Sequence, residues 1–192
     1  MSFDHPLSQL DPRVRRTRAD VVAAAGRMLL EEGWDAVTHA RVAARAGYSR
    51  ATLYRHWGAH ADLIELALEH VNGMPHSTPT GDVAADLVAE LDAFRAFLTS
   101  GGFGTVLAAL AHHAVGDERM AGLRDEAVAR SLTLVRELVE KAQAEGRLLR
   151  SLDADAAVAM LAGGLIHTVT VGRPPADGRA FAERCVAAVL RG

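Results

Sequence analysis

The sequence predicts an all-α fold of about nine helices, with a small N-terminal three-helix domain followed by a larger helical domain. Hydrophobic residues make up 49% of the 192 residues and aromatic residues only 5%, and alanine is abundant, which favours closely packed helices over sheet. Apolar residues recur at steps of three and four along most of the chain, as they do on one face of a helix. Glycine or proline follows most of these segments, and both residues end helices.

The N-terminal residues, 1–12, contain two prolines and no helical period, so we expect a disordered arm there. Thr17 is the expected N-cap of the first helix, with Asp20 reaching back in a weak version of a capping box. Gly33 should end this helix, because glycine can follow a helix in the left-handed conformation. The expected buried stripe consists of Val21, Ala25, Met28 and Leu29.

The next stretch predicts two short helices joined by a tight turn. Thr38 is a good N-cap, since its hydroxyl can accept a hydrogen bond from the first turn of a helix over about residues 39–46. Gly47 stands where that helix must stop. Ser49 can then cap a second helix over about residues 50–57. This arrangement is typical of a helix-turn-helix motif.

The second of these helices carries polar side chains on its outer face. Leu53 and Trp57 lie four residues apart and should face inward. Arginine can bind guanine through two N–H groups, threonine offers a hydroxyl and a methyl group, and tyrosine and histidine can donate to phosphate oxygens. The face therefore suits nucleic acid, and a charged, solvated face of an ordinary helical bundle is the alternative. The outward positions are Arg50, Ala51, Thr52, Tyr54, Arg55 and His56.

At these residues the chain resembles the TetR family of transcriptional regulators. The similarity runs from about Thr17 to Leu68, and its core is the pattern Thr38-x3-Val42-Ala43-x2-Ala46-Gly47-Tyr48-Ser49-x2-Thr52-Leu53-Tyr54-x-His56-Trp57. Two positions depart from the family, which usually has phenylalanine in place of Trp57 and lysine in place of His60. The resemblance implies a repressor that binds a palindromic operator in double-stranded DNA as a homodimer and is released by a small-molecule effector.

The expected domains follow from this resemblance and from the turn-forming residues. We expect a helix-turn-helix DNA-binding domain over residues 13–58 and a connecting helix over 59–71. The stretch 72–81 is rich in turn-forming residues and marks the boundary of a ligand-binding and dimerisation domain over 72–192. The helices expected in that domain cover residues 82–99, 103–115, 117–145, 154–171 and 177–190.

Roles on the DNA-binding surface are assigned by side-chain chemistry. Arg50 and Thr52 should read bases. His60 stands where the family has lysine, so its phosphate contact should be weaker and should depend on pH. The expected phosphate contacts are Thr38, Ser49, Tyr54, His56 and His60, with His39, Arg41 and Arg55 as weaker candidates and Ala51 on the same face.

The charge distribution favours DNA binding at one end of the chain. The net charge is −3, but residues 1–60 hold nine arginines against six acids and carry +3, whereas residues 61–192 carry −6. This asymmetry can confine the attraction of phosphate to the N-terminal part. No segment approaches the roughly 20 apolar residues of a membrane span, no signal peptide is evident, and the single Cys185 has no disulfide partner. We therefore expect a cytoplasmic protein in which Cys185 is a buried apolar residue.

The last two helices are the expected homodimer interface. Gly163 and Gly164 lie in the middle of the first of them, where missing side chains permit close approach of a partner helix. The alternative is that these glycines only let helices of one chain cross, or leave room for a ligand.

The effector pocket is expected among the helices of the C-terminal domain, although plain core packing would explain the same residues. His112, His113 and His167 are polar candidates, but adjacent histidines on a helix point about 100° apart, so we expect no metal. The ligand should be small and mostly apolar. The expected ligand-binding residues are Phe94, Phe97, Phe103, Leu107, Leu110, His113, Met120, Leu123, Met160, Leu161, Gly164, Leu165 and His167.

Two functions from different classes are compatible with the sequence. The first is the ligand-responsive DNA-binding regulator. The second is a small-molecule-binding or protein-interaction module that keeps the fold without specific DNA binding, and the replacement of lysine by His60 favours it. An enzyme is the least favoured class, because no catalytic residues, cofactor site or metal cluster can be identified in the sequence.

Overall fold

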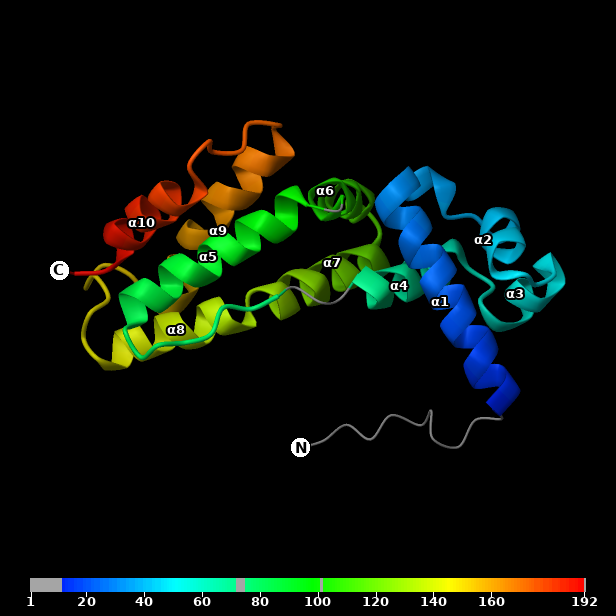
Figure 1. Cartoon of the computed structure of the whole chain (residues 1–192), viewed down its shortest axis with the longest axis horizontal. Helices are drawn as coiled ribbons and strands as arrows, with labels where there is room; N and C mark the ends of the chain where they lie inside the picture. The colour runs from blue at the N-terminus through cyan, green and yellow to red at the C-terminus, as the bar shows by residue number, and fades with distance from the viewer. Residues whose placement is uncertain (1–11, 72–74, 101, 192) are drawn as a thin grey trace. The chain divides into compact units, whose positions relative to one another are not determined.

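The computed structural model describes residues 12–71, 75–100 and 102–191, so residues 1–11 of the expected disordered arm lie outside it. The regular structure of the described residues consists of ten α-helices and one 3-10 turn (Figure 1). The only β-type pairing among them is an isolated bridge between Leu148 and Leu190. The chain forms two compact units, residues 1–72 and 73–192. The predicted all-α fold is confirmed.

The N-terminal unit is built on its first helix. It contains α1 (Pro12–Glu32), the 3-10 turn η2 (Trp34–Ala36), α2 (His39–Ala46), α3 (Arg50–His56) and α4 (His60–Val71). α1 packs on both α4 and α2, and α2 packs on α3. α1 and α4 cross closely at Gly26, where a Cβ atom would lie 2.3 Å from the Cβ of His70. The buried core includes Val21, Ala25, Met28, Leu29, Val42, Leu53, Leu63 and Ala67, which confirms the stripe predicted for α1.

The predicted start of α1 is wrong. The helix begins at Pro12, five residues before Thr17, and the hydroxyl of Thr17 donates to the carbonyl of Arg13 inside the helix. Proline is favoured at the first helical position, and the arginine-rich residues after it are good helix formers. Asp20 caps nothing and instead accepts a hydrogen bond of 2.7 Å from the hydroxyl of Tyr48. The predicted end is correct, since Gly33 follows the helix with φ 87°.

The C-terminal unit is organised around its first helix. It contains α5 (Val83–Thr99), α6 (Phe103–His113), α7 (Glu118–Ser131), α8 (Thr133–Ala144), α9 (Ala154–Thr170) and α10 (Gly178–Val189). α5 packs against α8 on one side and against α9 and α10 on the other (Figure 1). Among the described residues no single helix is long and apolar enough to cross a membrane, although α5 and α6 together would meet that test as a bent pair.

The single helix expected over residues 117–145 is two helices, α7 and α8, which meet at Leu132. The hydroxyls of Ser131 and Thr133 donate to the carbonyls of Ala127 and Ala129, each four residues earlier. Hydroxyl groups that bond back in this way bend helices. Leu132 itself is buried, so the break also brings an apolar side chain into the core.

Two buried carboxylates on α5, Asp86 and Glu90, hold the segment that leads into the unit. Glu90 is completely buried and accepts from the backbone N–H of Ser77 at 2.8 Å and from its hydroxyl at 2.9 Å. The Nδ1 atom of His76 lies 2.7 Å from the other oxygen of Glu90. Asp86 accepts from the N–H and hydroxyl of Thr80 and from the N–H of Gly81. Residues 76–81, expected only as a turn-rich boundary, are therefore fastened to α5.

We predict that Asp86→Asn destabilises the protein at neutral pH and that this effect fades in acid. The hydrogen bonds from Thr80 hold the pKa of Asp86 below its ordinary value of 3.8. A carboxylate with a pKa lowered by folding stabilises the protein above the unfolded pKa, and this contribution is lost as the pH falls through the folded pKa. Urea unfolding of wild type and variant between neutral pH and about pH 3 measures the difference. The exposed Asp125→Asn is the control, and a difference independent of pH would contradict the prediction.

Candidate DNA-binding surface

The turn between α2 and α3 has the predicted geometry. The hydroxyl of Thr38 accepts from the N–H of Arg41 at 3.4 Å, at the N-terminus of α2. Gly47 follows α2 in the left-handed conformation, with φ 80° and ψ 27°. The hydroxyl of Ser49 accepts from the N–H of Thr52 at 3.1 Å and caps α3. Both predicted caps and the glycine turn are confirmed.

α3 divides into a buried side and an exposed side, as its sequence predicts. Leu53 is completely buried and Trp57, which follows the helix, is half-buried. The guanidinium of Arg50 makes no hydrogen bond or ion pair with any described residue. Thr52 is half-buried, and its hydroxyl lies 2.9 Å from the hydroxyl of Ser49. The exposed residues of the helix are Arg50, Ala51, Tyr54, Arg55 and His56.

His39 does not lie on the exposed surface, which corrects its place among the candidate DNA contacts. Its side chain is buried at 8% exposure, and its Nε2 atom lies 2.7 Å from the carbonyl oxygen of Trp57. Its ring stacks on the ring of Tyr54, with centroids 4.0 Å apart and planes 5° apart. His39 therefore ties α2 to the end of α3 and supports Tyr54, which is 51% exposed.

Ion pairs hold two arginines of α2 against the end of α1. Arg41 pairs with Glu32, and Arg45 pairs with both Glu31 and Glu32. The guanidinium of Arg41 is half-exposed, so a phosphate would have to share it with Glu32. The network restrains α2, and it leaves Arg50 and Arg55 as the arginines of the motif without a carboxylate partner among the described residues.

His60 is placed so that it can donate to phosphate only when it is protonated. Its Nε2 atom lies 2.9 Å from the carbonyl oxygen of Val37, so this nitrogen must carry the proton. In a neutral ring the other nitrogen, Nδ1, is then an acceptor and would repel a phosphate oxygen. The ring of Trp34 packs edge-on against His60, with centroids 6.1 Å apart.

The residues expected to bind an effector are absent from the lining of the three cavities that the structure describes. Most of them are core residues, and Phe97 packs on Phe103 with ring centroids 4.3 Å apart. Three of the expected ligand-binding residues are instead exposed, which corrects the expectation that they lie inside a pocket: Met160, His113 and His167. The described cavities lie between α5 and α10, beside α7 and α8, and where α5, α6 and α9 meet, and none is lined by a residue of the expected set.

In the described part of the chain, no group of three histidine, cysteine, aspartate or glutamate side chains could hold a metal ion. Cys185 is half-buried rather than fully buried, and burial raises the pKa of its thiol. A thiol with a raised pKa is a poor nucleophile at neutral pH.

Comparison with known proteins gives matches along most of the chain. Residues 21–67 match a family model described as bacterial regulatory proteins, tetR family, and residues 78–189 match one described as Tetracyclin repressor-like, C-terminal domain. An uncharacterized HTH-type transcriptional regulator, YdeS, of Bacillus subtilis is 30% identical over 83% of this chain and 81% of its own. A DNA-binding transcriptional repressor, TetR, of Mycobacteroides abscessus is 29% identical over 90% of each chain.

A solved structure has the same fold as this chain. The TetR family transcription regulator SCO0332 is 31% identical, with a TM-score of 0.69, over 89% of this chain and 94% of its own.

We predict that Gly47→Ala lowers the free energy of unfolding by about 1–2 kcal/mol, because a Cβ atom disfavours the left-handed conformation. Outside Gly47 and its two chain neighbours, no heavy atom lies within 4 Å of the position that the Cβ would occupy, so the cost comes from the backbone and not from a clash. Gly58→Ala is the matched control, since Gly58 lies in the same unit, has no left-handed φ and would make only an ordinary contact of 3.6 Å. Equal urea unfolding curves for the two variants would refute the prediction.

Proposed function

Since the chain belongs to the TetR family of transcriptional regulators, we propose that it is a repressor that binds a palindromic operator as a homodimer and is released by a small ligand. The observation that carries this proposal is the exposed face of α3, capped by Ser49 and seated on Leu53, with an arginine that has no protein partner among the described residues. An unpaired arginine fork on a capped helix is suited to the edge of a guanine in the major groove.

The proposed division of roles follows from the contacts of each side chain. Arg50 reads a base, because its guanidinium is exposed and unengaged by the described residues. Tyr54 holds a phosphate, since the residue is 51% exposed while its ring is stacked on His39. Thr52 contacts a base mainly through its methyl group, because its hydroxyl lies within hydrogen-bonding distance of Ser49. Thr38, Ser49 and His56 remain proposed phosphate contacts.

Two copies of the chain are needed for this mode of binding. A seven-residue reading helix buries little surface, whereas two such helices about 34 Å apart can enter successive major grooves. The last two helices, α9 and α10, are the proposed interface. On α9, Met160 is 50% exposed, and outside the helix's own backbone no heavy atom lies within 4 Å of a Cβ built on Gly163. Gly164 faces inward instead, 3.6 Å from the ring of Phe181. The exposed stripe on α9 consists of Ala159, Met160, Gly163, His167 and Thr170.

One observation favours the second function, a ligand-binding or protein-interaction module without specific DNA binding. His60 occupies the position where family members usually carry lysine, and its Nε2–H group is directed to the carbonyl of Val37. The start of α4 therefore offers phosphate no permanent positive charge at this position.

Selection of bound duplexes from a random DNA library, repeated at several salt concentrations, decides between the two functions. Enrichment of a palindrome with two half-sites supports the repressor. Binding that disappears as salt is added and that enriches no sequence supports the second function, because such binding is purely electrostatic.

We predict that Arg50→Ala relaxes the sequence preference by about 1–3 kcal/mol at one base pair of each half-site, since it removes a bidentate contact to a base. Tyr54→Phe should instead weaken binding to all sequences alike, because it removes a phosphate contact. Arg27→Ala, an exposed arginine of α1, controls for the loss of positive charge. Unchanged preferences after repeated selection with Arg50→Ala would show that the base and phosphate roles are wrongly assigned.

For the dimer, we predict that Met160→Glu raises the dimer dissociation constant about tenfold or more, because a charge would be buried at the centre of an apolar interface. Sedimentation velocity measures the dissociation constant, and operator affinity should fall in parallel. Gln143→Glu adds the same charge at an exposed position of α8 and serves as the control. A fully dimeric Met160→Glu protein would place the interface elsewhere.

A further inference from the structure

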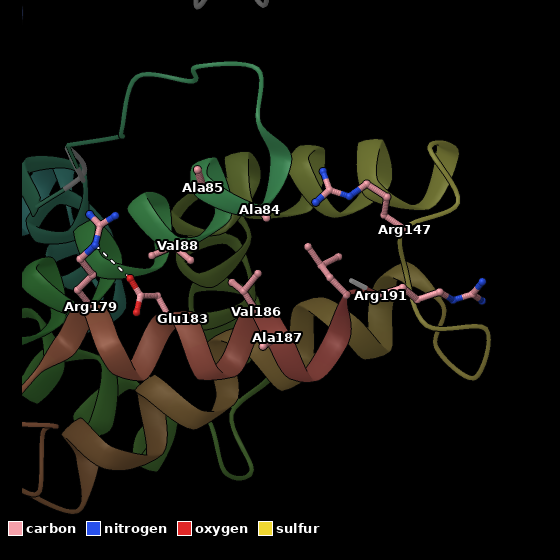
Figure 2. Close-up of a pocket in the computed structure, with 10 residues that line it drawn as sticks. Ala84, Ala85, Val88, Arg147, Arg179, Glu183, Val186, Ala187 and Arg191 are labelled. Carbon is pink, nitrogen blue, oxygen red and sulfur yellow. Dashed lines mark hydrogen bonds and ion pairs between the residues drawn. The ribbon is translucent and has the colours of Figure 1, made fainter.

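A groove of about 450 Å³ lies between α5 and α10 in the C-terminal unit. Its size falls within the roughly 300–1,000 Å³ of pockets that bind small molecules. Figure 2 shows its floor, formed by Val88 of α5 and Val186 of α10, with Ala84, Ala85 and Ala187 along the sides. Short side chains at these alanine positions leave the space between the two helices open.

Arginines stand at both ends of this apolar floor. Figure 2 shows Arg179 at one end, and at the other end Arg147, whose guanidinium points toward Ala84. Arg191 also lines the groove, but its guanidinium points outward. The acid in the lining is Glu183. This set is positive in a part of the chain, residues 61–192, that carries −6 overall.

Arg147 is the better anchor for an anion. Its backbone N–H donates to the carbonyl of Ala142 at 2.9 Å, and its carbonyl accepts from the N–H of Arg191 at 2.6 Å, so the base of the side chain is fixed. The nearest carboxylates, of Asp82 and Glu145, lie 3.8 and 4.0 Å from its guanidinium, beyond hydrogen-bonding distance. The guanidinium is therefore loosely paired with two carboxylates and makes no hydrogen bond with a described residue.

Arg179 is engaged more closely than Arg147. Its Nε atom lies 3.3 Å from the carboxylate of Glu183, one helical turn along α10. The two ends of the groove therefore differ, since the guanidinium of Arg179 is hydrogen-bonded to an acid, whereas that of Arg147 is only loosely paired with acids.

We propose that this groove binds an amphipathic carboxylate, a molecule with one carboxylate group and an unbranched apolar body. The carboxylate lies on the guanidinium of Arg147, where a charge-assisted, bidentate contact is available. The apolar body lies along Val88 and Val186, away from water. This inference names a site and a chemical class for the small ligand of the proposed repressor. Its connection to the release of DNA rests on the proposed function.

Decanoate and decanol are the probes, because they share a ten-carbon chain and differ in charge. Titration calorimetry of the full chain without DNA should show that decanoate binds at least about tenfold more tightly than decanol. Arg147→Gln should remove this preference and leave the binding of decanol unchanged. Arg150→Gln, at an exposed arginine in the turn before α9, is the matched control and should bind both probes as wild type does.

A second variant tests the apolar part of the groove. Ala187→Trp places a large ring in the groove from an exposed position of α10, so it should abolish the binding of both probes without changing the circular dichroism spectrum. Equal binding of decanoate and decanol to wild type, or an unchanged preference in Arg147→Gln, would overturn the proposal. A change of oligomeric state in Ala187→Trp, with no decanoate binding to wild type, would overturn it too and show that a second copy covers the groove.

Measuring operator affinity with and without decanoate distinguishes failure of this inference from failure of the proposed function. Decanoate binding that follows the predicted pattern and lowers operator affinity supports both. The same binding with unchanged operator affinity upholds the site and refutes its part in DNA release. If the chain selects and binds an operator but binds neither decanoate nor decanol, the proposed repressor function is upheld. The proposed ligand site in the groove is then refuted.

Discussion

The short third helix depends on contacts outside itself. α3 has seven residues, and isolated helices of fewer than about 12–15 residues are marginal in water. Ser49 caps its first turn, Leu53 anchors its middle in the core, and the imidazole of His39 binds the carbonyl of Trp57 at its end. Gly47 sets the direction in which the helix leaves α2. The exposed face of α3 is therefore held at both ends and from below, and its side chains meet a partner from a fixed backbone.

Several charged groups near α3 form ion pairs with one another. The acids at the end of α1, Glu31 and Glu32, bind Arg41 and Arg45 of α2. The hydroxyl of Tyr48 donates a hydrogen bond to Asp20 of α1. These contacts use polar groups to fix the motif, whereas Arg50 makes none with the described residues. Because ion pairs at the surface contribute little stability individually, their main effect here is to leave Arg50 and Arg55 as the arginines of the motif without a carboxylate partner among the described residues.

Local chemistry was enough to predict the caps, the glycine turn and the two faces of α3, because each depends on residues within one or two helical turns. Two errors are local, namely the N-cap at Thr17 and the unbroken helix over residues 117–145, and the others concern contacts between distant residues. His39 looks like an exposed candidate until Trp57 and Tyr54 are brought beside it, and Met160 and His167 fit a helical stripe that turns out to face solvent. The groove between α5 and α10 was missed for the same reason, since Arg147 and Arg179 are 32 residues apart and no motif links them.

The buried carboxylates of α5 hold the segment that precedes this helix, and one of them follows residues of the proposed groove. The segment that Asp86 and Glu90 hold begins at His76, and only four residues separate it from the end of α4 at Val71. From His76 to Gly81 the chain must follow α5, because moving away would leave buried charges without partners, which is costly. Ala84 and Ala85 line the proposed groove and directly precede Asp86 in the same helix. The proposed groove and the carboxylate that fastens residues 76–81 are therefore built from adjacent residues of one helix.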